Sequence, residues 1–211
     1  MPRTTPSRFP ERAVTDRAEL DTLFDDVLLA HVGLTVDDHP VVLPTGIVRD
    51  GDRVIIHGST GSRWMRALAD GAAAAVSITA LDAVVVARTG FESSFQYRSA
   101  VLFGTFTPLG GLEKIQALGR LTDRLIPGRL AEVRASTPKE VAATLALAMP
   151  IEEWSLKSSH LWPEDLDDDI AGEAWAGVVP VRTVYGPVVD APDLRPGIPV
   201  APSVARLVGG E

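Results

Sequence analysis

The sequence predicts an α+β protein, mainly β, in which helices flank an antiparallel sheet or barrel. Three β-prone runs, 31–36, 40–48 and 53–58, follow one another with short gaps between them. The gaps hold an Asp-Asp pair and an Asp-Gly pair, which are typical of turns and hairpins. Two segments with a helical spacing of apolar residues, 16–30 and 112–126, lie on either side of this block.

The remaining segments fit the same plan. A short helix follows the glycine and serine residues after position 58, and Thr137-Pro138-Lys139-Glu140 opens another helix with a capping box. The remaining predicted strands are 73–80, 83–88, 98–109, 151–159 and 176–184.

One domain, residues 16–185, accounts for these elements. Residues 1–15 show little periodicity and predict an irregular N-terminal arm. Residues 186–211 hold five prolines between positions 187 and 203, which predicts an extended tail without regular structure.

Composition excludes several classes of function. The net charge of −8 disfavours nucleic acid and anionic membranes as partners. The absence of cysteine excludes disulfides and thiolate chemistry. No apolar run approaches the ~20 residues of a membrane helix, and the N-terminus lacks the apolar core of a signal peptide. We therefore expect a cytoplasmic protein that acts on a small molecule.

The stretch IIHGSTGSRWMRAL, residues 55–68, places small and polar residues at the mouth of a helix. Helix N-termini carry unsatisfied N–H groups, and glycine lets an anion approach them closely. Arg63 adds a forked cation that suits phosphate. The stretch has neither P-loop nor GxGxxG spacing. From the residues alone, a serine-capped connection and a phosphate site both remain open.

Three strings together resemble the pyridoxamine 5′-phosphate oxidase-like family of flavin-nucleotide-binding proteins, in particular its nitroimidazole-resistance-like branch. They are VVLPTGIVRDGDRVIIHGSTGSRWMRAL, QYRSAVLFGTFTPL and WAGVVPV. The resemblance covers about residues 16–184. It implies a six- to eight-stranded antiparallel split β-barrel with flanking helices, a homodimer, and FMN bound at the dimer interface.

The resemblance also implies the cofactor-binding residues. Leu43, Pro44 and Thr45 would edge the flavin ring, and His57, Gly58 and Ser59 would lie beside the ring and the ribityl chain. Ser62 and Arg63 would hold the phosphate. Ser99 matches a position that touches flavin, with Tyr97 and Arg98 near it.

Two departures argue against a true pyridoxamine phosphate oxidase. The tail lacks the Arg-X-His segment of those enzymes, and Trp64 stands where a lysine usually follows Ser-Arg. Relatives in this branch often carry histidines before Tyr-Arg-Ser, whereas this chain has Glu92, Ser93 and Ser94. The segment Glu92–Gln96 is therefore the part of the sequence on which the identity of the substrate depends.

The other chemistry-bearing residues have simpler interpretations. No two histidines have metal-ligand spacing, so we expect no metal site. We expect the acidic run from Asp165 to Asp169 to be a solvated loop. The tryptophans Trp154, Trp162 and Trp175 are interpreted as core residues, with cover for a flavin in a second subunit as the alternative.

The preferred function is an FMN-dependent oxidoreductase that acts on a small electrophile, with NAD(P)H as a candidate electron donor. A nitro compound, a quinone and an enone fit equally well, and no catalytic residue is assigned. The alternatives are a non-catalytic FMN-binding or carrier protein, and a split barrel adapted to another ligand such as haem or deazaflavin.

Overall fold

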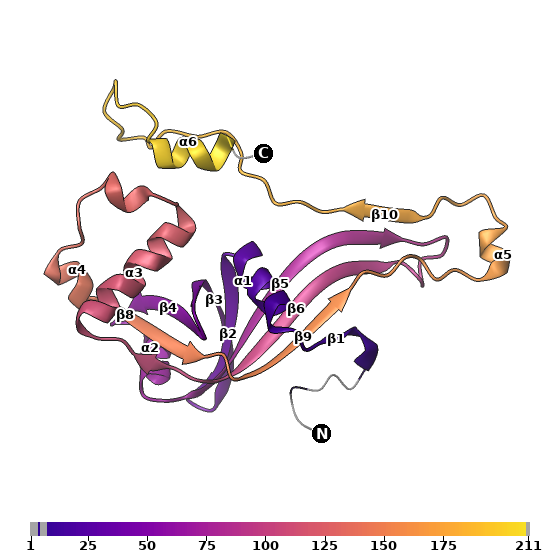
Figure 1. Ribbon diagram of the computed structural model, residues 1–211, viewed down its shortest axis with the longest axis horizontal. Helices are drawn as coiled ribbons and strands as arrows, with labels where there is room; N and C mark the ends of the chain where they lie inside the picture. Colours follow the sequence, from indigo (N-terminus) through magenta and orange to yellow (C-terminus); the bar gives the residue numbers. More distant parts are fainter. Residues whose placement is uncertain (1–3, 5–7, 210–211) are drawn as a thin grey trace.

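The computed structural model describes residue 4 and residues 8–209. It shows an antiparallel sheet of ten strands with six α-helices, and the sheet is not closed (Figure 1). The strand order is β1-β9-β6-β5-β2-β3-β4-β8-β7, and β10 pairs with β5 off this path. The α+β class is therefore confirmed, with more strands than the six to eight that were predicted.

The strands are β1 (Ala13–Val14), β2 (Leu29–Val36), β3 (His39–Asp50), β4 (Arg53–Ser59), β5 (Ala73–Val86), β6 (Ser94–Thr105), β7 (Thr107–Pro108), β8 (Thr144–Pro150), β9 (Glu153–Ser159) and β10 (Gly177–Pro180). The α-helices are α1 (Arg17–Asp26), α2 (Arg63–Ala69), α3 (Gly111–Leu125), α4 (Pro138–Ala142), α5 (Asp167–Ile170) and α6 (Pro202–Gly209). Two 3₁₀ turns, η1 (Pro10–Arg12) and η2 (Arg129–Ala131), complete the elements.

Strand β3 joins the two halves of the sheet. Its first part, as far as Gly46, pairs with β2, and its last part, from Ile47, pairs with β4. The changeover is fixed by the Ile47 N–H, which donates to the Leu28 carbonyl at 3.2 Å. Beyond the Ile47–Ile56 pair, β3 and β4 have no further paired residues in the register. The split of the barrel therefore lies beside Gly46.

Strand β5 replaces two predicted strands, 73–80 and 83–88. A β-bulge between Leu81 and Ala83 leaves Asp82 as the extra residue. Before the bulge the buried side chains have even numbers (Ala74, Val76, Ile78), and after it they have odd numbers (Ala83, Val85, Ala87). Because side chains alternate between faces, the extra residue keeps both apolar sets on the buried face.

Strand β8 was not predicted. Helix α4 ends at Ala142, after five residues, and the run TLALAMP then forms a strand paired with β4 along its whole length. A short continuous apolar run fits a buried helix and a buried strand equally well by periodicity. Pairing with β4 on one side and β7 on the other decides for the strand.

The helix caps agree with the sequence. The Asp16 carboxylate accepts from the Ala18 N–H at 2.9 Å at the start of α1. Thr137 and Glu140 form the predicted capping box of α4. The two ends of the chain differ from the prediction, because η1 and β1 lie within the N-terminal arm and α6 ends the tail that was expected to be extended.

Two apolar clusters hold the molecule together. The larger one fills the interior of the sheet and includes Ile56 and Met65, which are fully buried. The smaller one lies under α3 and includes Ile55 and Leu121. Successive residues of β4 therefore serve opposite faces, and the outer face needs α3 as its cover.

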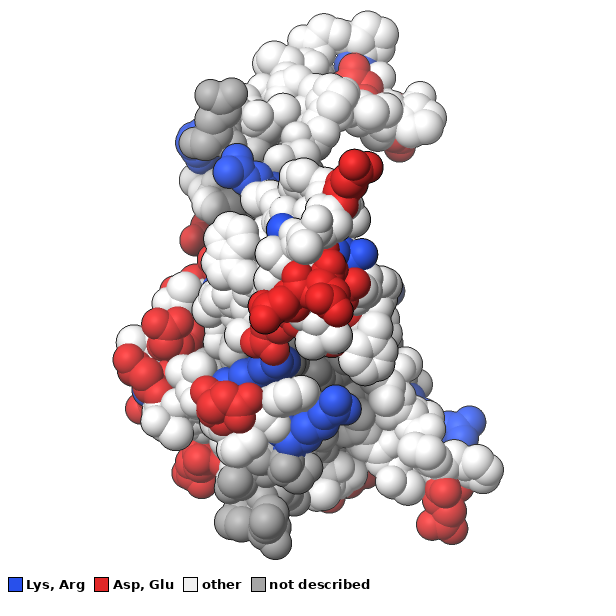
Figure 2. All heavy atoms as spheres, turned by 90° about the vertical axis from the view of Figure 1, so that its right-hand side faces the viewer, with Lys and Arg blue, Asp and Glu red and all other residues white. Residues whose placement is uncertain are grey.

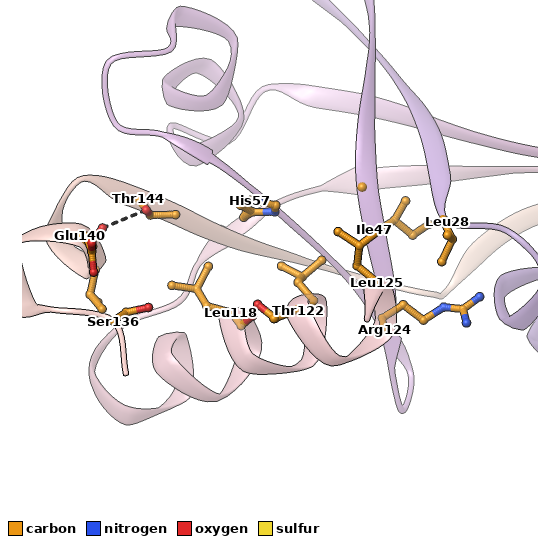
Figure 3. Close-up of a pocket in the computed structure, with 13 residues that line it drawn as sticks. Leu28, Ile47, His57, Leu118, Thr122, Arg124, Leu125, Ser136, Glu140 and Thr144 are labelled. Atoms are coloured by element: carbon orange, nitrogen blue, oxygen red, sulfur yellow. Dashed lines mark hydrogen bonds between the residues drawn. The ribbon is translucent and has the colours of Figure 1, made fainter. Parts of the chain in front are cut away.

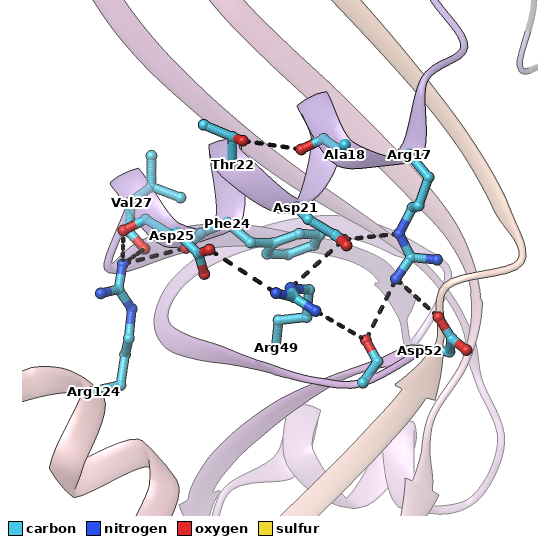
Figure 4. Close-up of polar contacts among 11 residues, drawn as sticks. Arg17, Ala18, Asp21, Thr22, Phe24, Asp25, Val27, Arg49, Asp52 and Arg124 are labelled. Atoms are coloured by element: carbon cyan, nitrogen blue, oxygen red, sulfur yellow. Dashed lines mark hydrogen bonds and ion pairs between the residues drawn. The ribbon is translucent and has the colours of Figure 1, made fainter.

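Arg124 fastens α3 to α1. Its Nη2 donates to the carbonyls of Phe24 and Val27 at 3.2 Å each, and also to the Asp25 carbonyl (Figure 4). These carbonyls belong to the last turn of α1, where the helix leaves acceptors unpaired. The contact positions the C-terminal half of α3 beside the split.

Strands β5 and β6 extend as an arm whose tip lies near α5 (Figure 1). Acidic side chains gather on the face seen from this end (Figure 2), where α5 carries Asp167 to Asp169. The prediction of a fully solvated acidic run is wrong for Asp165. Its side chain is 0% exposed and accepts from Arg88 Nη1 at 2.9 Å, so it fastens this end of the arm.

Two tryptophan predictions also need correction. Trp154 packs against the core, as expected, but Trp162 and Trp175 are 69% and 66% exposed. Within residues 8–209, no helix is long and apolar enough to cross a membrane.

Candidate functional site

The predicted anion loop lies between β4 and α2 and is tightly fixed. The Ser59 hydroxyl accepts from the Gly61 N–H at 3.1 Å, and the Ser59 carbonyl accepts from the Ser62 N–H at 3.0 Å. Thr60 donates to the Ala143 carbonyl through its N–H and its hydroxyl. Ser62 is the N-cap of α2, but its own hydroxyl makes no capping bond. The loop therefore leaves the Ser62 side chain available.

Arg63 begins α2 and points away from the core. Its Nη1 lies 2.5 Å from Asp37 Oδ2, and the two side chains are 73% and 70% exposed. An exposed ion pair of this kind contributes ~0–1 kcal/mol, so either partner can exchange it for another. Asp37 therefore holds the guanidinium beside the loop and would compete with an incoming anion.

Gly58 has a packing role that the sequence did not reveal. A Cβ at this position would lie 2.8 Å from Met65 Cγ. Met65 is fully buried in the larger core cluster. The glycine therefore lets β4 approach α2, whether or not a ligand also approaches it.

The other predicted ring-contacting segment lies along β3. Leu43 and Thr45 are partly buried, whereas Pro44 between them is exposed and pairs with His31 of β2. This segment ends at Gly46, where β3 changes partners. The structure therefore places Leu43–Thr45 and His57–Ser59 on the two strands that border the split.

His57 and Gly46 line a cavity of about 290 Å³ at this split (Figure 3). Its other walls come from α3 and from the segment 136–144. The remaining lining residues are Leu28, Ile47, Leu118, Leu121, Thr122, Arg124, Leu125, Ser136, Glu140, Val141 and Thr144. Of the predicted site residues, only His57 is among them.

One end of the cavity is polar. Glu140 is paired with Arg134 through contacts of 2.6 and 2.8 Å, and its carbonyl accepts from the Thr144 hydroxyl at 2.9 Å. The Arg134 guanidinium, together with the Thr137 N–H, lowers the pKa of Glu140 to about 2. This carboxylate is therefore ionised at neutral pH and already has its counter-ion.

Burial lowers the pKa of His57 below its ordinary value, although the residue keeps an exposed surface. A neutral imidazole is therefore the prevailing form at neutral pH. The His57 ring makes no hydrogen bond to any residue that the structure describes. It therefore offers a free polar group to the cavity.

Tyr97, Arg98 and Ser99 lie on β6, which is separated from β4 by β5, β2 and β3 in the strand order. Arg98 donates to both carboxylate oxygens of Asp82, at 2.8 and 3.1 Å, and to Asp26 at 2.5 Å. These contacts raise the pKa of Arg98 and hold the bulge of β5. The Ser99 and Thr79 hydroxyls lie 3.1 Å apart. No contact joins Tyr97, Arg98 or Ser99 to the β4–α2 loop among the described residues, and the flavin role of these three residues stays a prediction.

The segment Glu92–Gln96 lies at the tip of the arm. The Ser93 hydroxyl accepts from the Ala87 N–H, and Gln96 donates to the Leu161 carbonyl. These bonds shape the tip of the arm.

The walls of the cavity were not predicted. The amphipathic stripe of 112–126 was interpreted as packing on the barrel, which holds for Leu121 and Leu118. Both residues also line the cavity, as does Leu125 of the same stripe, which is 55% exposed. The signal that could have shown this is the width of the stripe, since α3 carries more apolar residues than one packed face requires.

The family model for pyridoxamine 5′-phosphate oxidase matches residues 16–158, which are most of the chain. The chain belongs to this family. The match ends inside β9, so α5, β10 and the tail lie beyond it. No curated protein matches the chain.

Several solved structures are similar to this family member over most of its length. The FAD and haem binding protein from Mycobacterium smegmatis is 58% identical, with a TM-score of 0.90, over 94% of this chain and 98% of that one. A flavocytochrome from Azotobacter vinelandii is 32% identical, with a TM-score of 0.89, over 97% and 96%. Both matches extend beyond the family model into the tail.

A third structure is similar in fold alone. It is a putative 5-nitroimidazole antibiotic resistance protein from Bacteroides thetaiotaomicron, 16% identical with a TM-score of 0.57, over 69% of this chain and 85% of that one. The predicted family is thus confirmed. The Mycobacterium smegmatis relative binds FAD and haem, and the Azotobacter vinelandii relative is a flavocytochrome.

Proposed function

We propose that the chain is a flavin-dependent oxidoreductase that acts on a small electrophilic organic molecule. The observation that carries the proposal is the 58% identity, over nearly the whole of both chains, to a protein that binds FAD and haem. The geometry supports the proposal. The predicted ring-contacting segments, 43–45 and 57–59, border the split, and the predicted phosphate residues, Ser62 and Arg63, come directly after the second segment in the chain.

The residues present fit a flavin phosphate. The Ser62 hydroxyl is uncommitted, and Arg63 is held beside it only by an exposed ion pair to Asp37. A phosphate that replaces Asp37 would gain a charge-assisted hydrogen bond from the guanidinium. When bound, the flavin supplies the electron or hydride chemistry, and the protein positions it and limits the access of water.

For the flavin itself we propose FAD ahead of FMN. The sequence motif resembles FMN-binding relatives, but the relative that is 58% identical is described as binding FAD. FAD and FMN share the phosphate that Ser62 and Arg63 would hold and differ only beyond it. Both flavins are therefore compatible with this loop. NAD(P)H is proposed as the electron donor.

A second candidate is a flavoprotein that also carries haem. It is favoured by the same relative and by the flavocytochrome. The cavity beside His57 has a volume of about 290 Å³, and no contact among the described residues of this chain identifies a haem ligand in it. We therefore assign no residue to a haem.

We also propose that the protein works as a homodimer. Exposed apolar side chains lie along the arm and the tail, and they include Phe95, Trp162, Trp175 and Val189. Exposed apolar side chains contribute no stability to a monomer, whereas a second copy of the chain could bury these residues in an interface. Light scattering coupled to gel filtration would check this, and a monomer at micromolar concentration would contradict it.

The flavin test uses purified protein without added cofactor. We expect a flavin absorption spectrum, and mass analysis of the released ligand distinguishes FAD from FMN. A haem Soret band in the same spectrum would support the second candidate. A colourless preparation that does not take up either flavin would refute both.

Substitution of Arg63 tests the phosphate position. Arg63→Ala should weaken flavin binding by ~1.5–3 kcal/mol, because a hydrogen bond to a charged group is lost. Asp37→Asn is the matched control, since it frees Arg63 and should not weaken binding. Equal flavin affinity of the Arg63 variant and the native protein would show that the phosphate does not bind at Arg63. Oxidation of the reduced flavin by a panel of acceptors separates an enzyme from a carrier.

A further inference from the structure

The cavity under α3 has mostly apolar walls and one polar end (Figure 3). Ser136, Glu140 and Thr144 lie together at the polar end, His57 lies nearer the middle, and Leu28, Ile47 and Leu125 lie toward the other end. The apolar lining residues are Leu28, Ile47, Leu118, Leu121, Leu125 and Val141. Such walls favour a ring or chain of carbon atoms over a sugar or a phosphate.

The charged lining residues already have partners. Arg124 donates to three carbonyls of α1, and Glu140 is paired with Arg134. An anion that entered the cavity would lose its water without gaining a free cation, which is strongly unfavourable. The cavity therefore selects an uncharged molecule.

The cavity offers free hydrogen-bonding groups. The Thr122 and Thr144 hydroxyls donate to the carbonyls of Leu118 and Glu140. By contrast, the His57 ring and the Ser136 hydroxyl make no hydrogen bond to another described residue. A neutral imidazole carries one N–H donor, so His57 can bind an oxygen acceptor of the ligand.

The cavity also adjoins the proposed flavin site. Gly46 follows the predicted ring-contacting residues of β3 directly, and His57 belongs to those of β4. A molecule in the cavity would therefore lie next to a flavin held between these two strands.

From these features we propose that the cavity under α3 is the substrate pocket, and that it takes a flat, uncharged carbocycle with a carbonyl oxygen, the quinone class, whose oxygen accepts from His57. This inference rests on the proposed flavin function. It adds a position, a ligand class and a residue that orients the ligand.

The test measures equilibrium binding of menadione to the purified protein by calorimetry, and it compares menadione with 1,4-naphthoquinone-2-sulfonate and with a neutral nitroarene. Leu118→Trp fills the cavity from α3, and Val141→Phe fills it from the other side. Leu112→Trp is the matched control, because Leu112 lies on the same helix, is 69% exposed and does not line the cavity. Circular dichroism and flavin content check the fold of each variant.

We expect menadione to bind more tightly than the sulfonate and the nitroarene. Each folded cavity-filling variant should lose at least tenfold in affinity, with flavin content and the Leu112 variant unchanged. His57→Gln tests the donor by a separate readout. Loss of one neutral hydrogen bond should weaken menadione roughly three- to tenfold, and should weaken a methylnaphthalene without oxygen much less.

Equal menadione affinity in the native protein and in a folded cavity-filling variant would refute the assignment of this cavity as the substrate pocket. Preference for the sulfonate would overturn the selection for uncharged ligands, and preference for the nitroarene would overturn the quinone class. In each case a flavin spectrum would leave the proposed function standing. Protein that binds no flavin would instead refute the proposed function, and this inference with it.

Discussion

Replacement of Gly58 by alanine tests whether this glycine serves the packing of β4 on α2 or the approach of a ligand. The added Cβ would lie 2.8 Å from Met65 Cγ and 3.1 Å from its Sδ. Cγ is near the base of the side chain, so a change at the end of Met65 cannot relieve the contact. Met65 is 0% exposed, and its displacement must disturb other core residues.

The expected loss of stability follows from this overlap. One methyl group forced into a packed core costs ~1–3 kcal/mol. For a domain of this size, ~1 kcal/mol lowers the melting temperature by ~2–4 °C, so we expect a decrease of about 2–12 °C. Thermal and urea unfolding of flavin-free protein would measure it. Gly90→Ala is the control, since a Cβ there meets nothing within 4 Å.

A double substitution sharpens the test. In a Met65→Ala background the Cβ at position 58 no longer meets Met65, so Gly58→Ala should cost less than it does in the native protein. The difference should be ~0.5–3 kcal/mol, as for residues in direct contact. Equal cost in both backgrounds would refute the packing argument. Loss of flavin without loss of stability would show that Gly58 acts through a ligand.

Three further predictions concern titration and anchoring. Burial lowers the pKa of His57 from 6.5, so its contribution to stability is present above pH 6.5 and is lost as the pH falls. The native protein should therefore lose unfolding free energy between pH 7.5 and 5, and His57→Gln should lose less. A variant as acid-sensitive as the native protein would contradict this. The pKa of Glu140 is lowered from 4.5 to about 2, so the stability difference between native protein and Glu140→Gln should persist above pH 4.5 and vanish toward pH 2 in acid titrations. The Ser203 hydroxyl and N–H both donate to Glu132, so Ser203→Ala should accelerate hydrogen exchange in 202–209; unchanged exchange would show that α6 is anchored otherwise.

Much of the fold could be predicted because local signals and tertiary context agree. The Asp-Gly turn and the flanking apolar alternation predict the β3–β4 hairpin, and the Asp16 and Thr137 caps fix the starts of two helices. Strand β8 failed because an uninterrupted apolar run carries no period that distinguishes strand from helix. Its identity depends on β4, a partner far away in the sequence.

The site was only partly predictable for a related reason. The loop before α2 is local, so its small residues and Arg63 are visible in one short string. The cavity is assembled from β3, β4, α3 and the segment 136–144, and no short motif encodes that meeting. Arg98 shows the converse case. Its motif resembles a cofactor position, yet in this chain its guanidinium is committed to Asp82 and Asp26.

The bulge at Asp82 gives β5 one residue more than its pairing with β6 uses. Deletion of Asp82 would therefore leave Ala83 and the later residues of the strand opposite the same residues of β6, with Ala83 and Val85 still on the buried face. The contacts of Asp82 would be lost instead. Arg98 would lose the carboxylate that accepts two of its hydrogen bonds, and the Val181 N–H would lose the Asp82 carbonyl. A single-codon deletion here would thus keep the strand pairing of the arm while loosening the contacts that hold the arm to α1 and to the segment after β10.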